Sequence, residues 1–230
     1  MTLAFAAHGA DVVIASRKLA ACEALAAEVR KKTGRKALAV AAHVGNWEEC
    51  DLLAQTALDH FGRVDILVNN AGMSPLYDSL PEVSEALWDK VLAVNIKGPF
   101  RLSSVLGTAM VEAGGGSIIN VSSVAAIAPG PGEVPYGIAK AGLNNLTSSL
   151  SRVLAPKVRV NCLMPGPFLT DISKAWPEQT HEYFRKSIPM KRAGDPDEVV
   201  GAALYLASDL SSYTTGAVIK IDGGSTHAPA

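Results

Sequence analysis

The sequence predicts an α/β fold in which a doubly wound parallel sheet is covered by helices on both faces. First, short apolar runs rich in β-branched residues alternate along the chain with longer segments of helical character. Second, hydrophobic residues make up 48% of the chain, which is enough to bury a core. Third, the 230 residues contain no repeat, low-complexity tract or linker, which favours a single domain spanning residues 1–230.

The expected strands are short and almost continuously apolar, as is typical of parallel strands that are buried on both faces. Polar or turn-forming residues bound each of them. In chain order, they cover Val12–Ala15, Lys36–Ala42, Val64–Asn69, Ser117–Val121, Val158–Leu163 and Ala217–Ile221.

The expected helices are marked by their start and stop signals. Gly34 and Gly62 end the first two, Ser84 is expected to cap the third, and Pro196 stands near the start of the last. In chain order, the expected helices cover Leu19–Lys32, Trp47–Phe61, Ser84 to about Ile96, Pro99–Val111, Tyr136–Leu154 and Pro196–Ala207.

Charge and cysteine content exclude several classes of function. Charged residues are 19% of the chain and the formal net charge is −1, so neither a nucleic acid nor a membrane is expected as a partner. The three cysteines are scattered, so no disulfide framework and no metal site is predicted. The apolar runs are too short to span a bilayer and the start of the chain lacks the features of a signal peptide, so we expect a cytoplasmic protein.

Polar or conformationally special residues follow three of the expected strands. Asn69-Asn70-Ala71-Gly72, Ser122-Ser123 and Pro165-Gly166 each begin where a strand ends. In an open parallel sheet, ligands bind beyond the carboxyl ends of the strands, so these residues are expected to face one crevice. Taken singly, Asn69-Asn70 could be a capped strand end and Pro165-Gly166 a turn.

Tyr136 and Lys140 carry the strongest chemical signal. They lie four residues apart at the start of an expected helix and therefore project from one face. A free tyrosine, with a pKa of about 10, is a poor acid or base at neutral pH, but a nearby ammonium lowers that pKa. Tyr136 could then exchange a proton with a substrate oxygen, to which Ser123 could hydrogen-bond. The plainer alternative is an ordinary helical pair, with Tyr136 half-buried and Lys140 solvated.

Five motifs occur together in one order and at one scale. They are Asn69-Asn70-Ala71-Gly72, Val94-Asn95-Ile96-Lys97-Gly98, Ser122-Ser123, Tyr136 with Lys140, and Pro165-Gly166 with Thr170. This combination resembles the short-chain dehydrogenase/reductase family, from about residue 3 to Gly224. The resemblance implies a Rossmann-like fold and an NAD(P)-dependent oxidoreductase that interconverts a neutral carbonyl and a secondary alcohol by hydride transfer.

The resemblance also implies a catalytic tetrad of Asn95, Ser123, Tyr136 and Lys140. Tyr136 would be the general acid/base, and Ser123 would polarise the substrate oxygen. Lys140 would lower the pKa of the tyrosine and hold the hydroxyls of the nicotinamide ribose. Asn95 would hold a water molecule in the proton relay.

The resemblance places further residues around the cofactor. Asn69 and the following Asn70, Ala71 and Gly72 would line the side of the adenosine ribose and stabilise the central sheet. On the nicotinamide side, the implied contacts are Pro165, Gly166, Phe168 and Thr170. His43-Val44 stands where the family usually has an Asp-Val pair that contacts the adenine, so His43 could offer a ring nitrogen there or be a partly exposed loop residue.

The sequence departs from the family at its start. The family opens with a strand and a glycine-rich TGxxxGxG turn, whereas Met1 to Asp11 resembles the later part of the helix that follows. The absent strand normally lies between the strands at Val12 and Val64, which would therefore lack their shared neighbour. We expect an N-terminally incomplete fold and a longer biological protein, with Met1 an internal methionine or the first ordered residue. The alternative is a non-catalytic, nucleotide-free fragment with a structural or interaction role.

The choice of cofactor depends on the end of the first strand. An acidic residue there would bind the ribose 2′-hydroxyl of NAD, but the chain has Ser16-Arg17. Arg17 could pair with a 2′-phosphate, which favours NADP, with NAD as the alternative. A solvated basic helix start is the plainer reading of Arg17 and Lys18.

The substrate and the assembly are less well specified. Residues 168–190 and the Pro- and Gly-rich segment 125–135 should form apolar walls, which suit a ketone, a sugar-like ketone or a 3-oxoacyl group. Four basic residues nearby are expected to be solvated, namely Arg185, Lys186, Lys191 and Arg192. The resemblance implies a homodimer or homotetramer, built on outer apolar stripes of the helices at 99–111 and 136–154. For the second stripe we expect Leu143, Leu146, Leu150 and Val153, unless these residues face the sheet.

Overall fold

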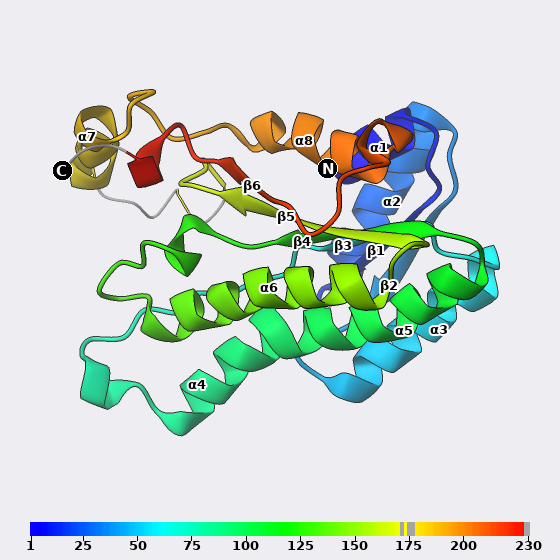
Figure 1. Cartoon of the computed structure of the whole chain (residues 1–230), viewed down its shortest axis with the longest axis horizontal. Coiled ribbons are helices and arrows are strands. Elements are labelled where there is room, and N and C mark those ends of the chain that lie inside the picture. The colour runs from blue at the N-terminus through cyan, green and yellow to red at the C-terminus, as the bar shows by residue number, and fades with distance from the viewer. Residues whose placement is uncertain (171–172, 174–177, 228–230) are drawn as a thin grey trace.

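The computed structural model describes residues 1–170, 173 and 178–227 of the chain. Its strands lie between two layers of helices, as Figure 1 shows. One layer holds α3, α4, α5 and α6, and the other holds α1, α2 and α8. This arrangement confirms the predicted parallel α/β fold.

The strands are all parallel, but they form two sheets. In chain order they are β1 (Val12–Ser16), β2 (Ala37–Ala41), β3 (Ile66–Asn69), β4 (Gly116–Val121), β5 (Val158–Pro165) and β6 (Val218–Ile221). A two-stranded sheet has the order β1-β2, and a four-stranded sheet has the order β3-β4-β5-β6. Within the described residues, no ladder joins β1 to β3. The division falls where the sequence predicts that two sets of strands lack their shared neighbour.

The described helices include the six that were expected, with ends that differ by a few residues, and also α1 and α7, which were not among those six. They are α1 (Thr2–Ala7), α2 (Leu19–Thr33), α3 (Trp47–Phe61), α4 (Glu85–Leu92), α5 (Gly98–Glu112), α6 (Val134–Val153), α7 (Glu178–Ser187) and α8 (Val200–Ala207). Ser84 caps α4 by accepting a hydrogen bond from Leu87 N, as predicted. Gly34 and Gly62 end α2 and α3 in the left-handed conformation that glycine tolerates best.

The structure differs from the prediction between Ile96 and Pro99, where a break between two helices was expected. A π-helical segment, η2 (Ala93–Lys97), instead joins α4 to α5 without interruption. Two features account for the wider turn. Pro99 has no N–H to donate to the preceding turn, and the Asn95 side chain donates to Val91 O, a helical acceptor.

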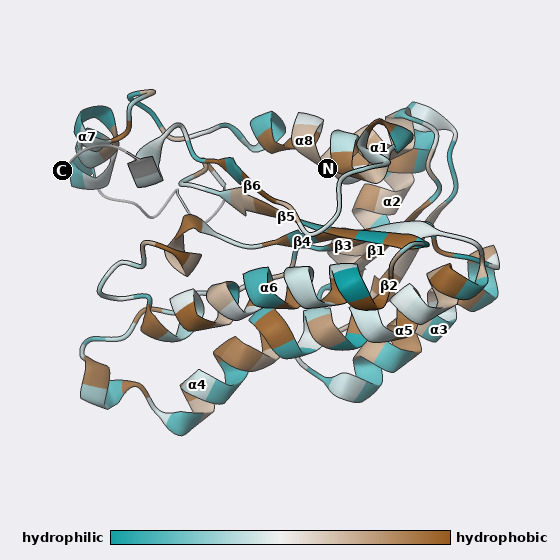
Figure 2. Ribbon diagram, in the orientation of Figure 1, coloured by the Kyte–Doolittle hydropathy of each residue, from teal (hydrophilic) through white to brown (hydrophobic). Residues whose placement is uncertain are grey.

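The apolar residues of α6 mostly face the sheet, which corrects the expected outer stripe. Leu143 is buried, and Leu150 packs in the core cluster with Met110, Ile118, Val158 and Val160. Leu146 is half-buried, and of these four residues only Val153 is clearly exposed, because a 3.6-residue period turns the other three toward the sheet. Figure 2 shows the apolar colour on β5 and β6, between the two helical layers. Assembly into a homodimer or homotetramer stays a prediction.

Among the described residues, no helix combines the length and the apolar character needed to cross a membrane.

Candidate active site

Tyr136 and Lys140 lie on the first turns of α6, next to the carboxyl end of β4. The Lys140 side chain is only 2% exposed, and its Nζ lies 5.6 Å from the centre of the Tyr136 ring. Lys140 Nζ donates to Val121 O at 2.8 Å, so the last residue of β4 fixes the ammonium beside the tyrosine. The plainer alternative of a solvated lysine is therefore wrong, and the spacing of four residues brings the two groups together.

Ser123 stands between β4 and the short helix η3 (Val124–Ala126). Its Oγ caps η3 by accepting from Ala125 N at 3.2 Å. Burial raises the pKa of Tyr136, and a side-chain hydrogen bond with Ser123 opposes this effect in part. The two hydroxyls can therefore reach the same substrate oxygen.

Asn95 reaches the same region from η2. It is fully buried, and its Nδ2 donates to Met73 O and Val91 O, while its Oδ1 accepts from Met73 N. A Cβ on Gly72 would lie 3.0 Å from Asn95 Oδ1 and 3.4 Å from Lys140 Nζ. Glycine therefore lets the loop after β3 pack closely against these two side chains. The four residues of the predicted tetrad thus lie in one region, where β3 and β4 end. The predicted water-holding role of Asn95 stays a prediction, since its amide already ties η2 to the loop after β3.

Burial dominates the protonation of the two catalytic candidates. It raises the pKa of Tyr136, and the Ser123 hydrogen bond opposes this only in part. Burial also lowers the pKa of Lys140 to about 8, so the ammonium still predominates at neutral pH. A neutral phenol beside a cation is suited to donating a proton rather than to accepting one.

The lowered pKa of Lys140 should give the protein a measurable dependence of stability on pH. Because the unfolded chain binds this proton up to a pKa of 10.5 and the folded one only to about 8, stability should rise with pH between those values. Relative to Lys140→Met, the wild type should gain up to about 3 kcal/mol of unfolding free energy across this window. Urea denaturation of both proteins at pH 7 and pH 10.5 measures it. If the difference in unfolding free energy between the two proteins is the same at both pH values, the Lys140 ammonium is not desolvated in the folded protein.

A buried polar network behind the site was not found from the sequence. Asn69 Nδ2 donates to Asn120 Oδ1 at 2.8 Å and to Ser103 Oγ at 3.0 Å, and Asn120 Nδ2 donates to Thr147 Oγ1 at 2.9 Å. Ser122, which directly follows β4, donates its Oγ hydrogen to Lys140 O. These bonds lock α6 to β3 and β4. The sequence signals were Asn69, to which the resemblance gave a role in stabilising the central sheet, and Asn120, a polar residue inside β4.

The predicted nicotinamide-side residues follow β5. Gly166 N donates to Ile221 O, and a Cβ on Gly166 would lie 2.9 Å from Asp222 Cα, so β6 packs directly against this turn. Phe168 bridges to Gly194, whose missing side chain leaves room for the ring. Thr170 is exposed. Pro165 ends β5, so the described part of this segment lies at the same sheet edge as Ser123. Residues 171–172 and 174–177 of the expected apolar wall lie outside the described residues.

The predicted adenosine-side residues lie at the ends of β1 and β2. Ser16 and Arg17 are exposed, and Ser16 O accepts from Ala42 N, which brings the ends of the two strands together. Asn70 and Ala71 are exposed where β3 ends. Val44 is half-buried, and its carbonyl accepts from Cys50 Sγ.

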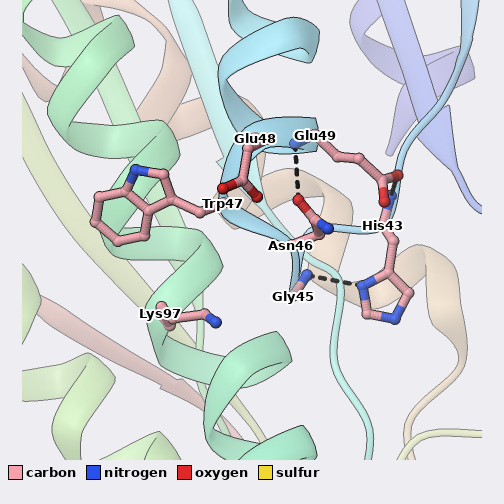
Figure 3. Close-up of a pocket in the computed structure, with 7 residues that line it drawn as sticks. All are labelled: His43, Gly45, Asn46, Trp47, Glu48, Glu49 and Lys97. Atoms are coloured by element: carbon pink, nitrogen blue, oxygen red, sulfur yellow. Dashed lines mark hydrogen bonds between the residues drawn. The ribbon is translucent and has the colours of Figure 1, made fainter.

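His43 is half-buried and held in one orientation. Its Nδ1 accepts from Gly45 N at 3.1 Å, and its backbone N–H donates to the Glu49 carboxylate. His43 is thus a partly exposed loop residue, which was one of the two alternatives. Figure 3 shows the ring on one side of a hollow of about 560 Å³, with Trp47 and Lys97 on the other side. Tyr136 and Lys140 do not line this hollow, so it belongs to the β2 end of the crevice and not to the tetrad.

A family model described as enoyl-(acyl carrier protein) reductase matches residues 1–226. Dehydrogenase/reductase SDR family member 4 of Homo sapiens is 36% identical over 222 residues, which are 95% of this chain and 80% of that protein. The 3-oxoacyl-(acyl-carrier-protein) reductase of Chlamydia muridarum is 36% identical over 222 residues, with 96% of this chain and 89% of that protein covered. The chain belongs to the short-chain dehydrogenase/reductase family.

A solved structure of this family shares the fold. It is the gluconate 5-dehydrogenase of Burkholderia cenocepacia in complex with NADP and tartrate, which is 30% identical. It superposes with a TM-score of 0.92 over 99% of this chain and 91% of that one. The short-chain dehydrogenase/reductase chain described here is thus an oxidoreductase by family, and its two-part sheet does not alter the placement of the remaining elements.

Proposed function

We propose that the protein is an NADP-dependent reductase of neutral carbonyl compounds, with Tyr136 as the proton donor. The observation that carries this proposal is the buried Lys140 ammonium, fixed by Val121 O beside the Tyr136 ring. Burying a cation costs several kcal/mol, which a fold accommodates mainly where the charge is used. A lysine with only a helical role would extend into solvent.

The proposed mechanism assigns each residue a task. The Ser123 hydroxyl holds the substrate oxygen, and the neutral Tyr136 phenol donates its proton to that oxygen as negative charge develops there. The Lys140 ammonium, 5.6 Å from the ring centre, stabilises the phenolate that remains. A bound nicotinamide would supply the hydride.

The charges around the entrance favour a neutral substrate. Arg185 pairs with Glu178 at 2.6 Å, and Arg192 makes a bidentate pair with Glu198 at 2.6 and 2.7 Å. The pair with Arg192 lowers the pKa of Glu198 to about 2. Two of the four basic residues expected to be solvated are therefore ion-paired, and each would have to leave its partner to bind a substrate carboxylate.

The test is a spectrophotometric assay of NADPH and NADH oxidation with a panel of apolar ketones, keto-sugars and 3-oxoacyl thioesters. The proposal predicts consumption of NADPH with a neutral ketone, and transfer of deuterium from labelled NADPH to the carbonyl carbon. Binding of NADPH should also be visible by fluorescence titration. If the folded protein neither binds nor oxidises either cofactor, the nucleotide-free alternative would be favoured.

Arg17 should decide the choice between the two cofactors. Its side chain is exposed at the end of β1, where it can reach a 2′-phosphate on the adenosine ribose. Arg17→Ala should therefore weaken NADPH binding at least about tenfold, the usual order for one charge-assisted contact, and NADH binding much less. Lys18→Ala is the matched control on the neighbouring residue. Equal losses for both cofactors would remove Arg17 from the phosphate site.

A further inference from the structure

The first turn of α6, which carries Tyr136, is not capped by its own N-cap residue. Its N-cap residue Glu133 makes no capping hydrogen bond, because its carboxylate accepts from Gly130 N instead. Pro135 has no N–H to satisfy. The N–H of Val134, the first residue of the helix, donates to the hydroxyl of Tyr77 at 3.0 Å. A side chain 57 residues earlier in the chain therefore caps this helix.

The Tyr77 hydroxyl both accepts and donates a hydrogen bond. It accepts from Val134 N, and it donates to Pro131 O at 3.4 Å. The tyrosine comes from the loop between β3 and η1 (Leu80–Glu82), and both partners belong to the loop and first turn that lead into α6. Figure 1 shows these two segments at the same end of the molecule. One phenol thus fastens together two loops that border the crevice.

Tyr136 follows Val134 by two residues, within the same helical turn. Any shift of that turn moves the Tyr136 hydroxyl relative to Ser123, which is fixed separately at the end of β4. We propose that Tyr77 is a positioning residue, which holds the first turn of α6 so that the Tyr136 hydroxyl meets the substrate oxygen. This role rests on the proposed function of Tyr136. It assigns no contact between Tyr77 and the reacting atoms.

The experiment compares Tyr77→Phe with the wild type. Removing the hydroxyl keeps the ring but frees Val134 N, so kcat for carbonyl reduction should fall about tenfold, as a misplaced proton donor implies. The Kd for NADPH should change by no more than about twofold, because Tyr77 is proposed to make no contact with the cofactor. A twofold change in Kd is a smaller binding free energy than the loss of one hydrogen bond would give. The solvent deuterium isotope effect on kcat should increase, because proton transfer becomes slower. In a Tyr136→Phe background, adding Tyr77→Phe should have no further effect.

Ser79→Ala is the matched control, because it removes a hydroxyl of the same loop that bonds only within that loop, to Glu82. It should leave kcat unchanged. Amide hydrogen exchange of Val134 in the wild type reads out the Tyr77 contact without any activity, and slow exchange is expected. A folded Tyr77→Phe protein with wild-type kcat and isotope effect, or fast exchange at Val134, would overturn the proposal. If the Val134 amide exchanges slowly in the wild type but the protein reduces no carbonyl compound, the result would count against the proposed function and not against the Tyr77 contact.

Discussion

Replacement of Tyr136 by Phe should lower kcat for carbonyl reduction by at least about 10²-fold, the usual contribution of a general acid. The ring that packs beside Lys140 is kept, so the fold and the binding of NADPH should change little. The measurement is steady-state kinetics with the best carbonyl of the panel, with circular dichroism to confirm folding. Tyr205→Phe is the matched control, since it removes a hydroxyl that bonds to Thr214 rather than to the tetrad.

The dependence of this reaction on pH follows from the direction of the Tyr136 pKa. Because burial raises that pKa, the phenol keeps its proton at neutral pH and reduction should proceed without a further ionisation. Oxidation of the alcohol needs the phenolate, so its rate should increase with pH as long as Lys140, with a pKa of about 8, keeps the charge that stabilises the phenolate. A folded Tyr136→Phe protein that turns over at near the wild-type rate would refute the assignment of Tyr136 as proton donor.

Gly98→Ala should be the most destabilising of the glycine substitutions near the site. A Cβ at this position would lie 2.0 Å from Val44 O and 2.9 Å from the Val44 carbonyl carbon. Both atoms belong to the backbone, so no side-chain rotation can relieve the contact, and α5 must move away from the β2–α3 loop. We expect a loss of at least about 3 kcal/mol of unfolding free energy, at the upper end for overpacking.

The control for Gly98→Ala is Gly201→Ala in α8, where a new Cβ would meet nothing within 4 Å. Alanine favours a helix over glycine by about 1 kcal/mol, so this variant should be as stable as the wild type or more so. Urea denaturation of the three proteins makes the comparison. A stability of Gly98→Ala within about 1 kcal/mol of the wild type would show that the loop carrying Val44 yields easily, since most tolerated core changes fall in that range.

Much of the local structure could be predicted, because it depends on residues close together in the chain. The strand cores and the caps at Ser84, Gly34 and Gly62 follow from periodicity and from backbone preferences. The pairing of Tyr136 with Lys140 also follows from local geometry, since residues four apart on a helix share a face. Sequence and resemblance together named four candidate residues that lie near one another in the structure, and their catalytic roles stay a prediction.

The sequence did not reveal which distant groups meet. The hydrogen bond from Asn120 to Thr147 joins residues 27 apart in the chain, and that from Val134 to Tyr77 joins residues 57 apart. Contacts between such distant residues produce no periodic pattern in the sequence. The outward face predicted for Leu143 and Leu150 was wrong for the same reason. A helical stripe shows that a face is apolar, but only packing decides whether that face meets the sheet or a second subunit.

The sequence by itself determined the order of strands and helices and the residue types at the ends of β3, β4 and β5. Only the tertiary structure decided that Lys140 is desolvated beside Tyr136 and that η2 turns Asn95 inward. The physical reason is that local preferences are set by neighbouring residues, whereas the burial and pKa of a group depend on atoms that other elements bring to it.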